Sequence, residues 1–123
     1  MHVPILKQGP YLIASIQSEL SDVELSEFKD ELVQRVGATR SRGVVIDVSV
    51  WDVLDSFSCR VLRDLVNMIK LRGAEAVVVG IQPEVAFTMV QLGLSLNGVM
   101  TALDLEEGLT YLGQRKNGGH GRA

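Results

Sequence analysis

Several residue types that build common functional sites are scarce in this sequence. It has one cysteine, Cys59, which excludes an internal disulfide, and two histidines, His2 and His120, which lie near the two ends and predict no metal site. No apolar run approaches the roughly 20 residues of a membrane-spanning helix. The first residues lack the basic and apolar regions of a signal peptide. We therefore expect a cytoplasmic protein that binds neither a metal nor a membrane.

Positive charge is also limited. With 12 Lys and Arg against 15 Asp and Glu, the net charge is −3, whereas nucleic acids are held by clustered basic residues. The 123 residues, 46% of them hydrophobic, suffice for one domain with a full core. We predict a single domain over residues 1–115 and a Gly-rich, disordered tail over residues 116–123. Proteins or small molecules, rather than nucleic acid, are the expected partners.

The apolar pattern predicts strands that alternate with helices. Two short apolar runs separated by Gln8-Gly9-Pro10 predict an antiparallel hairpin. Ser21 and Glu24 match a capping box at the start of a helix, which Gly37 is expected to end. The expected strands cover 3–7, 11–17, 44–48, 76–81 and 99–102, and the expected helices cover 21–37, 56–72, 83–92 and 104–115. The order ββαβαβαβα implies an α/β fold with a mixed, mostly parallel sheet and right-handed crossovers.

The stretch from Val44 to Arg60 is the centre of the functional interpretation. A buried strand leads through a loop to Asp55 and Ser56, which open an amphipathic helix. The first N–H groups of a helix are unpaired and carry a partial positive charge, so this position accepts negative charge such as a phosphate. Asp55 and Ser56 are on one interpretation simply good N-caps. On the other, Ser56 is phosphorylated, and Ser58 is the rival acceptor.

Catalytic chemistry is poorly supported. Cys59 lies at a helix start, where thiolates are stabilised, but the sequence offers no internal histidine as its base, so we expect a buried structural cysteine. Without an internal histidine, a Ser-His-Asp triad is also excluded, unless a second chain supplies the base. Asp47 ends a strand, as does the phosphorylated aspartate of a receiver domain. This sequence, however, does not offer the acidic cluster and the lysine that receiver chemistry needs. We expect Asp47 to bond the following loop instead.

These residues resemble a known family, the STAS domains of bacterial anti-sigma-factor antagonists, with their SpoIIAA-like fold. The element order, the strand Val44–Asp47 and the loop Val53-Leu54-Asp55-Ser56 are similar to those domains. Two further segments, Gly80-Ile81-Gln82-Pro83 and Thr101–Glu106, resemble the RsbS branch of this family, the scaffold proteins of the stressosome. The similarity extends to about Leu112.

The resemblance implies a non-enzymatic stress-signalling regulator without a cofactor. Such scaffolds assemble with RsbR-type paralogues and sequester an RsbT-type serine kinase. Phosphorylation of the scaffold's serine releases the kinase, and an RsbX-type phosphatase resets the system. The acceptor corresponds to Ser56, which follows Asp55, within a partner-binding loop that includes Phe57 and Ser58. Many relatives continue Asp-Ser-Ser-Gly, whereas Phe57 and Ser58 follow Ser56 in this sequence. This departure from the family pattern keeps Ser58 as the second candidate.

Two other functions stay open at this point. The chain could be a STAS-like sensor of a small ligand or nucleotide, although its glycines match no Walker or dinucleotide-binding spacing. It could also be a thiol or serine enzyme completed across a subunit interface. The regulator alone predicts co-assembly with proteins, as a homo-oligomer or in a large hetero-assembly.

Overall fold

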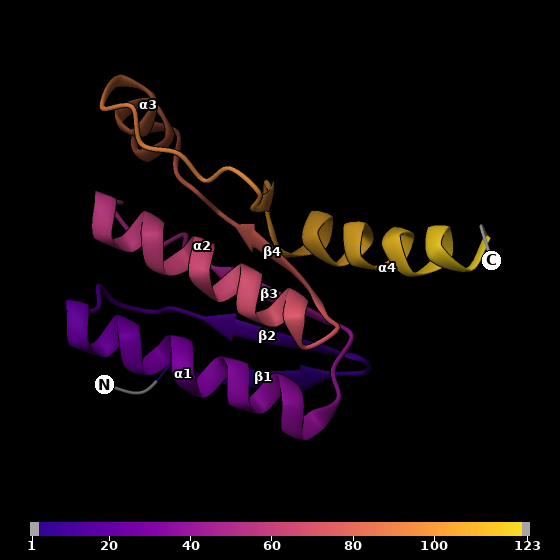
Figure 1. Cartoon of the computed structure of the whole chain (residues 1–123). Helices are drawn as coiled ribbons and strands as arrows, with labels where there is room; N and C mark the ends of the chain where they lie inside the picture. The colour runs from indigo at the N-terminus through magenta and orange to yellow at the C-terminus, as the bar shows by residue number, and fades with distance from the viewer. Residues whose placement is uncertain (1–2, 122–123) are drawn as a thin grey trace.

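The computed structural model describes the backbone of residues 3–121 and the side chains of residues 3–114. The described elements follow the order ββαβαβαβα, as predicted (Figure 1). In chain order they are β1 (Ile5–Gln8), β2 (Tyr11–Ser15), α1 (Asp22–Thr39), β3 (Gly43–Asp47), α2 (Ser56–Leu71), β4 (Glu75–Val79), α3 (Pro83–Gln91), β5 (Met100–Ala102) and α4 (Leu105–Gly121).

The strands form one sheet in the order β1-β2-β3-β4-β5. β1 pairs antiparallel with β2, and the other neighbours pair in parallel. Because each crossover joins adjacent parallel strands in the same direction, right-handed connections place α1, α2 and α3 on one face of the sheet. α4 follows β5 and covers the other face (Figure 1).

The central strands are buried on both faces. In β3, Val44 and Ile46 pack into the large core with α1 and α2, while Val45 packs into the smaller core beneath α4. β4 alternates in the same way, with Val78 in the large core and Val77 in the small one. This arrangement explains the continuous apolar runs of these strands, which are typical of parallel strands covered on both faces.

α1 begins as predicted but ends later. The Ser21 hydroxyl accepts a hydrogen bond from the Glu24 N–H (3.1 Å), and Glu24 Oε1 accepts one from the Ser21 N–H (2.9 Å), which completes the capping box. The predicted stop at Gly37 is wrong, because the helix continues to Thr39 and ends at Arg40 in the left-handed conformation (φ 52°). The glycine instead makes room for the side chain of Arg72, which occupies the space of a Cβ.

The last helix also extends past its predicted end. α4 continues to Gly121 rather than stopping near Arg115. The disordered tail over residues 116–123 stays a prediction, and residues 122–123 lie outside the described part of the chain. The single domain over 1–115 stays a prediction. Within the described residues, no helix is both long and apolar enough to cross a membrane.

Candidate functional site at the start of α2

The N-terminus of α2 is capped by Asp55. Its backbone is extended (φ −84°, ψ 179°), and its Oδ1 accepts a hydrogen bond of 2.8 Å from the Ser58 N–H. This bond, which favours the charged carboxylate, lowers the pKa of Asp55 below its ordinary value. Of the two capping residues that the sequence offered, the aspartate therefore takes the role, and Ser56 does not cap the helix.

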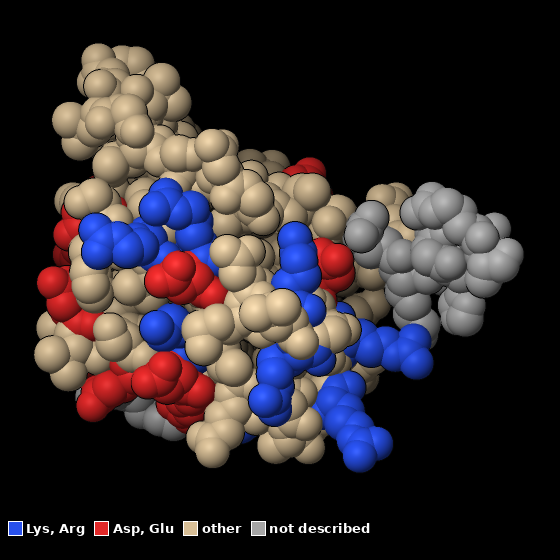
Figure 2. All heavy atoms as spheres, in the orientation of Figure 1, with Lys and Arg blue, Asp and Glu red and all other residues tan. Residues whose placement is uncertain are grey.

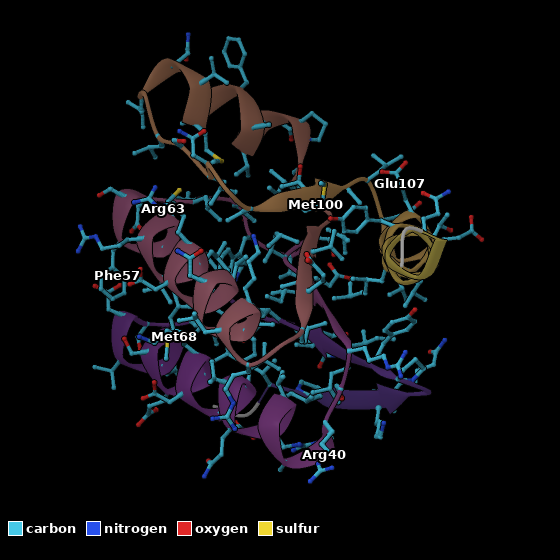
Figure 3. All side chains as sticks on the ribbon, turned by 45° about the vertical axis from the view of Figure 1, so that its right-hand side comes forward. Arg40, Phe57, Arg63, Met68, Met100 and Glu107 are labelled. Carbon is cyan, nitrogen blue, oxygen red and sulfur yellow. The ribbon has the colours of Figure 1, made fainter. Side chains whose placement is uncertain are left out.

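Ser56 is the first helical residue and is exposed. Its hydroxyl has no hydrogen-bond partner among the described residues. Ser58 is half-buried, and its backbone N–H is engaged by the cap. Phe57 packs against the large core on the side of α2 that faces α1 (Figure 3). Of the two candidate serines, Ser56 is thus the more accessible.

The loop that leads into α2 is fixed by two hydrogen bonds of the Ser49 backbone. Asp47 Oδ1 accepts a hydrogen bond from the Ser49 N–H (2.9 Å), which confirms the interpretation of Asp47 as a loop-bonding residue. The Ser49 carbonyl accepts a bond from Gln82 Nε2 (2.6 Å), across from the turn that follows β4. Further on, Trp51 and Leu54 are buried in the large core. The loop therefore presents Asp55 and Ser56 from a fixed frame.

Gly80 allows this close approach of the two loops. It adopts a positive φ of 84°, and a Cβ at this position would lie 2.8 Å from the Ser49 Cβ. The segment Gly80-Ile81-Gln82-Pro83 was predicted only to resemble the RsbS branch of the family. The roles of Gly80 and Gln82 at the loop were missed, because they depend on a contact between segments that are distant in sequence.

The surface beside the helix start is acidic. A shallow pocket of about 80 Å³ lies at the ends of α1 and α2. Its lining residues are Glu19, Leu20, Asp22, Trp51, Val53, Asp55 and Ser58. A phosphate on Ser56 would thus be attracted by the partial positive charge at the N-terminus of α2 and repelled by the nearby carboxylates.

Cys59 lies one turn into α2 and is a core residue. It is 1% exposed, and burial raises the pKa of its thiol. The expectation of a structural cysteine is confirmed, since a nucleophile needs an accessible thiolate. Among the described residues, no group of His, Cys, Asp and Glu is arranged to hold a metal ion.

Comparisons with known proteins all identify STAS-domain relatives. The family model of the STAS domain matches residues 2–107. The RsbT co-antagonist protein RsbRA of Bacillus subtilis (strain 168) is 30% identical over 98 residues, 80% of this chain and 34% of RsbRA. The chain therefore spans about a third of the length of this curated relative.

Two solved structures resemble nearly the whole chain. A serine-to-glutamate variant of RsbS from Moorella thermoacetica is 38% identical, with a TM-score of 0.81 over 95% of this chain and 99% of that one. A chain from a structure of the stressosome, described as a signal integration and transduction hub, is 36% identical. Its TM-score is 0.73, over 92% of this chain and 98% of that one. The similarity predicted from the sequence is confirmed.

Proposed function

Since this chain belongs to the STAS-domain family, we propose that it is a stressosome scaffold that sequesters a serine kinase and releases it when Ser56 is phosphorylated. One observation carries the proposal: the likeness to RsbS extends over almost the full length of both chains. A scaffold of this kind acts by binding rather than by catalysis. These relatives are a co-antagonist and stressosome proteins, in agreement with the prediction that the chain is not an enzyme.

The proposed partners follow from the same relatives. RsbRA is named as a co-antagonist of RsbT, so we place RsbR-type paralogues in the assembly and an RsbT-type kinase as its cargo. An RsbX-type phosphatase would remove the phosphate and reset the switch. All of these proteins would meet in the cytoplasm.

The choice of Ser56 as acceptor is supported by its position. A kinase must reach the serine hydroxyl, and that of Ser56 is exposed and unbonded within the described structure. The hydroxyl of Ser58 belongs to a half-buried residue whose backbone takes part in the cap. Phosphorylation there would disturb the start of α2, whereas a phosphate on Ser56 lies at the N-terminus of α2, whose partial positive charge favours negative charge.

The release step has a physical explanation. Val50 and Val53 are 45% and 62% exposed in the loop before Ser56, and they offer an apolar contact to a partner. Phosphorylation adds about −1.5 to −2 charges at neutral pH. A partner that covers the loop would have to strip water from this charge next to the Asp55 carboxylate, which costs free energy. We expect this cost to weaken kinase binding while the fold remains intact.

Mass spectrometry tests the acceptor. The chain and its Ser56→Ala and Ser58→Ala variants are incubated with the cognate kinase and ATP, and the phosphate is located in peptides. The proposal predicts one phosphate, lost only in Ser56→Ala. Loss only in Ser58→Ala would move the switch to the second candidate. No phosphate on any variant, with a kinase active on another substrate, would contradict the proposal.

A ligand sensor is the second candidate function, and a pocket favours it. A hollow of about 350 Å³ lies between α2, β4, β5 and α4. Its lining residues are Val66, Lys70, Glu75, Ala76, Gly98, Val99, Met100 and Tyr111. Small-molecule sites start at about this volume. A rise in melting temperature with nucleotides would support this function, because a ligand that binds only the folded state stabilises it.

A further inference from the structure

A long stretch without charged residues covers most of α3, all of β5 and the loop between them. From Val85 to Leu103 the sequence has no Lys, Arg, Asp, Glu or His. We call residues 85–103 the uncharged lobe. Figure 2 shows it as a projection without blue or red atoms, whereas the face made by α1 and α2 carries both signs. Figures 1 and 3 place it at the opposite end of the sheet from β1.

The uncharged lobe exposes much of the apolar surface of the molecule. Of the eleven large hydrophobic side chains that are exposed among the described residues, five belong to it. They are Phe87, Val90, Leu92, Met100 and Leu103. Exposed apolar side chains that gather in one segment of a charged protein indicate an interaction surface.

α3 itself is apolar on both sides. Val85 and Met89 face the large core and are buried. Phe87 and Val90 lie on the other side of the helix and are 64% and 79% exposed. The polar residues of α3, Glu84, Thr88 and Gln91, share one stripe of the helix. Beside that stripe, α3 keeps an exposed apolar side in addition to the side that packs in the core, so it has more apolar surface than one buried face requires.

We propose that the uncharged lobe is the surface on which a second copy of this chain docks. Two copies of a chain with net charge −3 repel each other. In a two-fold contact, a residue near the axis meets its own mate, so charges there would face charges of the same sign. The uncharged lobe avoids this penalty and offers each copy an equally apolar surface.

The edge of the sheet supports the same occupant. β5 is an end strand whose described neighbour is β4, and its outer backbone edge faces away from the sheet. Two identical edge strands related by a two-fold axis run antiparallel and can exchange backbone hydrogen bonds. Met100, labelled in Figure 3, lies on this strand and is 42% exposed.

The uncharged lobe is tied to the helix that carries Ser56. Arg63 of α2 donates a hydrogen bond through Nη1 to the Ser95 carbonyl, in the loop between α3 and β5. This bond fixes the lobe before docking and so reduces the entropy that association costs. Since the lobe itself contains no charge, its contact should persist when Ser56 is phosphorylated. The inference deepens the proposed function by naming the surface through which the scaffold assembles.

Sedimentation equilibrium of the full chain tests this inference. Val90→Asp places a charge in the contact, and Leu71→Asp is the matched control, because Leu71 is 88% exposed at the end of α2, outside the lobe. We expect the wild-type chain to self-associate and Val90→Asp to raise the dissociation constant at least about tenfold. Leu71→Asp and a change from low salt to about 0.5 M salt should have little effect. Circular dichroism checks that each variant is folded.

Several outcomes would overturn the inference. These are a monomeric wild type at all concentrations, equal weakening by Leu71→Asp, undiminished association of folded Val90→Asp, or association that salt abolishes. Kinase assays separate this result from the proposed function. A Val90→Asp monomer that is still phosphorylated on Ser56 supports both, whereas loss of kinase binding with self-association intact would assign the lobe to the kinase.

Discussion

Asp55 and Ser58 are joined by a hydrogen bond of 2.8 Å between the carboxylate Oδ1 and the backbone N–H, which caps α2. The proposed phosphoacceptor, Ser56, lies between them and takes no part in the cap. A phosphate can therefore be added without removing the bond that starts the helix. The switch and the cap are separate functions of adjacent residues.

Removal of the cap should destabilise the domain. We expect Asp55→Ala to lower the free energy of unfolding by about 1 kcal/mol, as is typical for loss of an N-cap side chain. Urea denaturation measures this change. Asp52→Ala is the control, because Asp52 is exposed in the same loop and does not cap α2. Equal effects of the two substitutions would contradict the assigned cap.

The Asp55 cap should also make stability depend on pH. The pKa of Asp55 is lowered in the folded state, first by the hydrogen bond from the Ser58 N–H. The folded state therefore binds the proton less readily than the unfolded state, in which the pKa is about 3.9. The stabilisation is complete above that value and is lost as the pH falls through the folded pKa.

An Asp55→Asn variant isolates this contribution, since asparagine caps without titrating. Unfolding free energies of wild type and variant, measured from neutral pH down to acid, should converge as the pH falls. A constant difference across this range would contradict the assignment. Glu24, whose pKa is also lowered, first by its hydrogen bond from the Ser21 backbone, titrates in both proteins and cancels in the comparison.

Gly80 should be less replaceable than other glycines with a positive φ. Gly80→Ala meets both backbone strain and the Ser49 side chain, whereas Gly93→Ala meets strain alone, since nothing lies within 4 Å of a Cβ there. We expect Gly93→Ala to cost about 1 kcal/mol and Gly80→Ala clearly more, about 2–3 kcal/mol. Thermal or urea unfolding of the two variants measures the difference. Equal costs would mean that the two loops do not touch at Ser49.

Arg40 offers a stabilising substitution. It ends α1 in the left-handed conformation (φ 52°), where glycine is the preferred residue. Arg40→Gly should raise the free energy of unfolding by up to about 1 kcal/mol, with α1 unchanged. Arg42→Gly is the control, since Arg42 does not have a positive φ. A loss of stability in Arg40→Gly would show that the arginine side chain matters more than its backbone strain.

Two features that the sequence did not predict depend on contacts between distant segments. Regular apolar spacing and capping signals are local, so they located all the elements and the start of α1. Gly37 was predicted to end α1 because glycine is common at helix ends. The structure gives it another role, since the side chain of Arg72, which follows α2, occupies the space of a Cβ at this position. The frame of the Ser56 loop, from Ser49 to Gln82, was equally beyond local reasoning. Asp55 and Ser56 were both plausible caps, and only backbone geometry separates them.

The most direct test of the central claim is the affinity of the cognate kinase for this chain before and after phosphorylation. Calorimetry with the unmodified chain, the chain phosphorylated on Ser56 and the Ser56→Ala variant measures it. The account predicts tight binding to the unmodified chain and to Ser56→Ala, and at least about tenfold weaker binding to the phosphorylated chain, a loss of about 1.4 kcal/mol. Equal affinity for the phosphorylated and unmodified chains would contradict it.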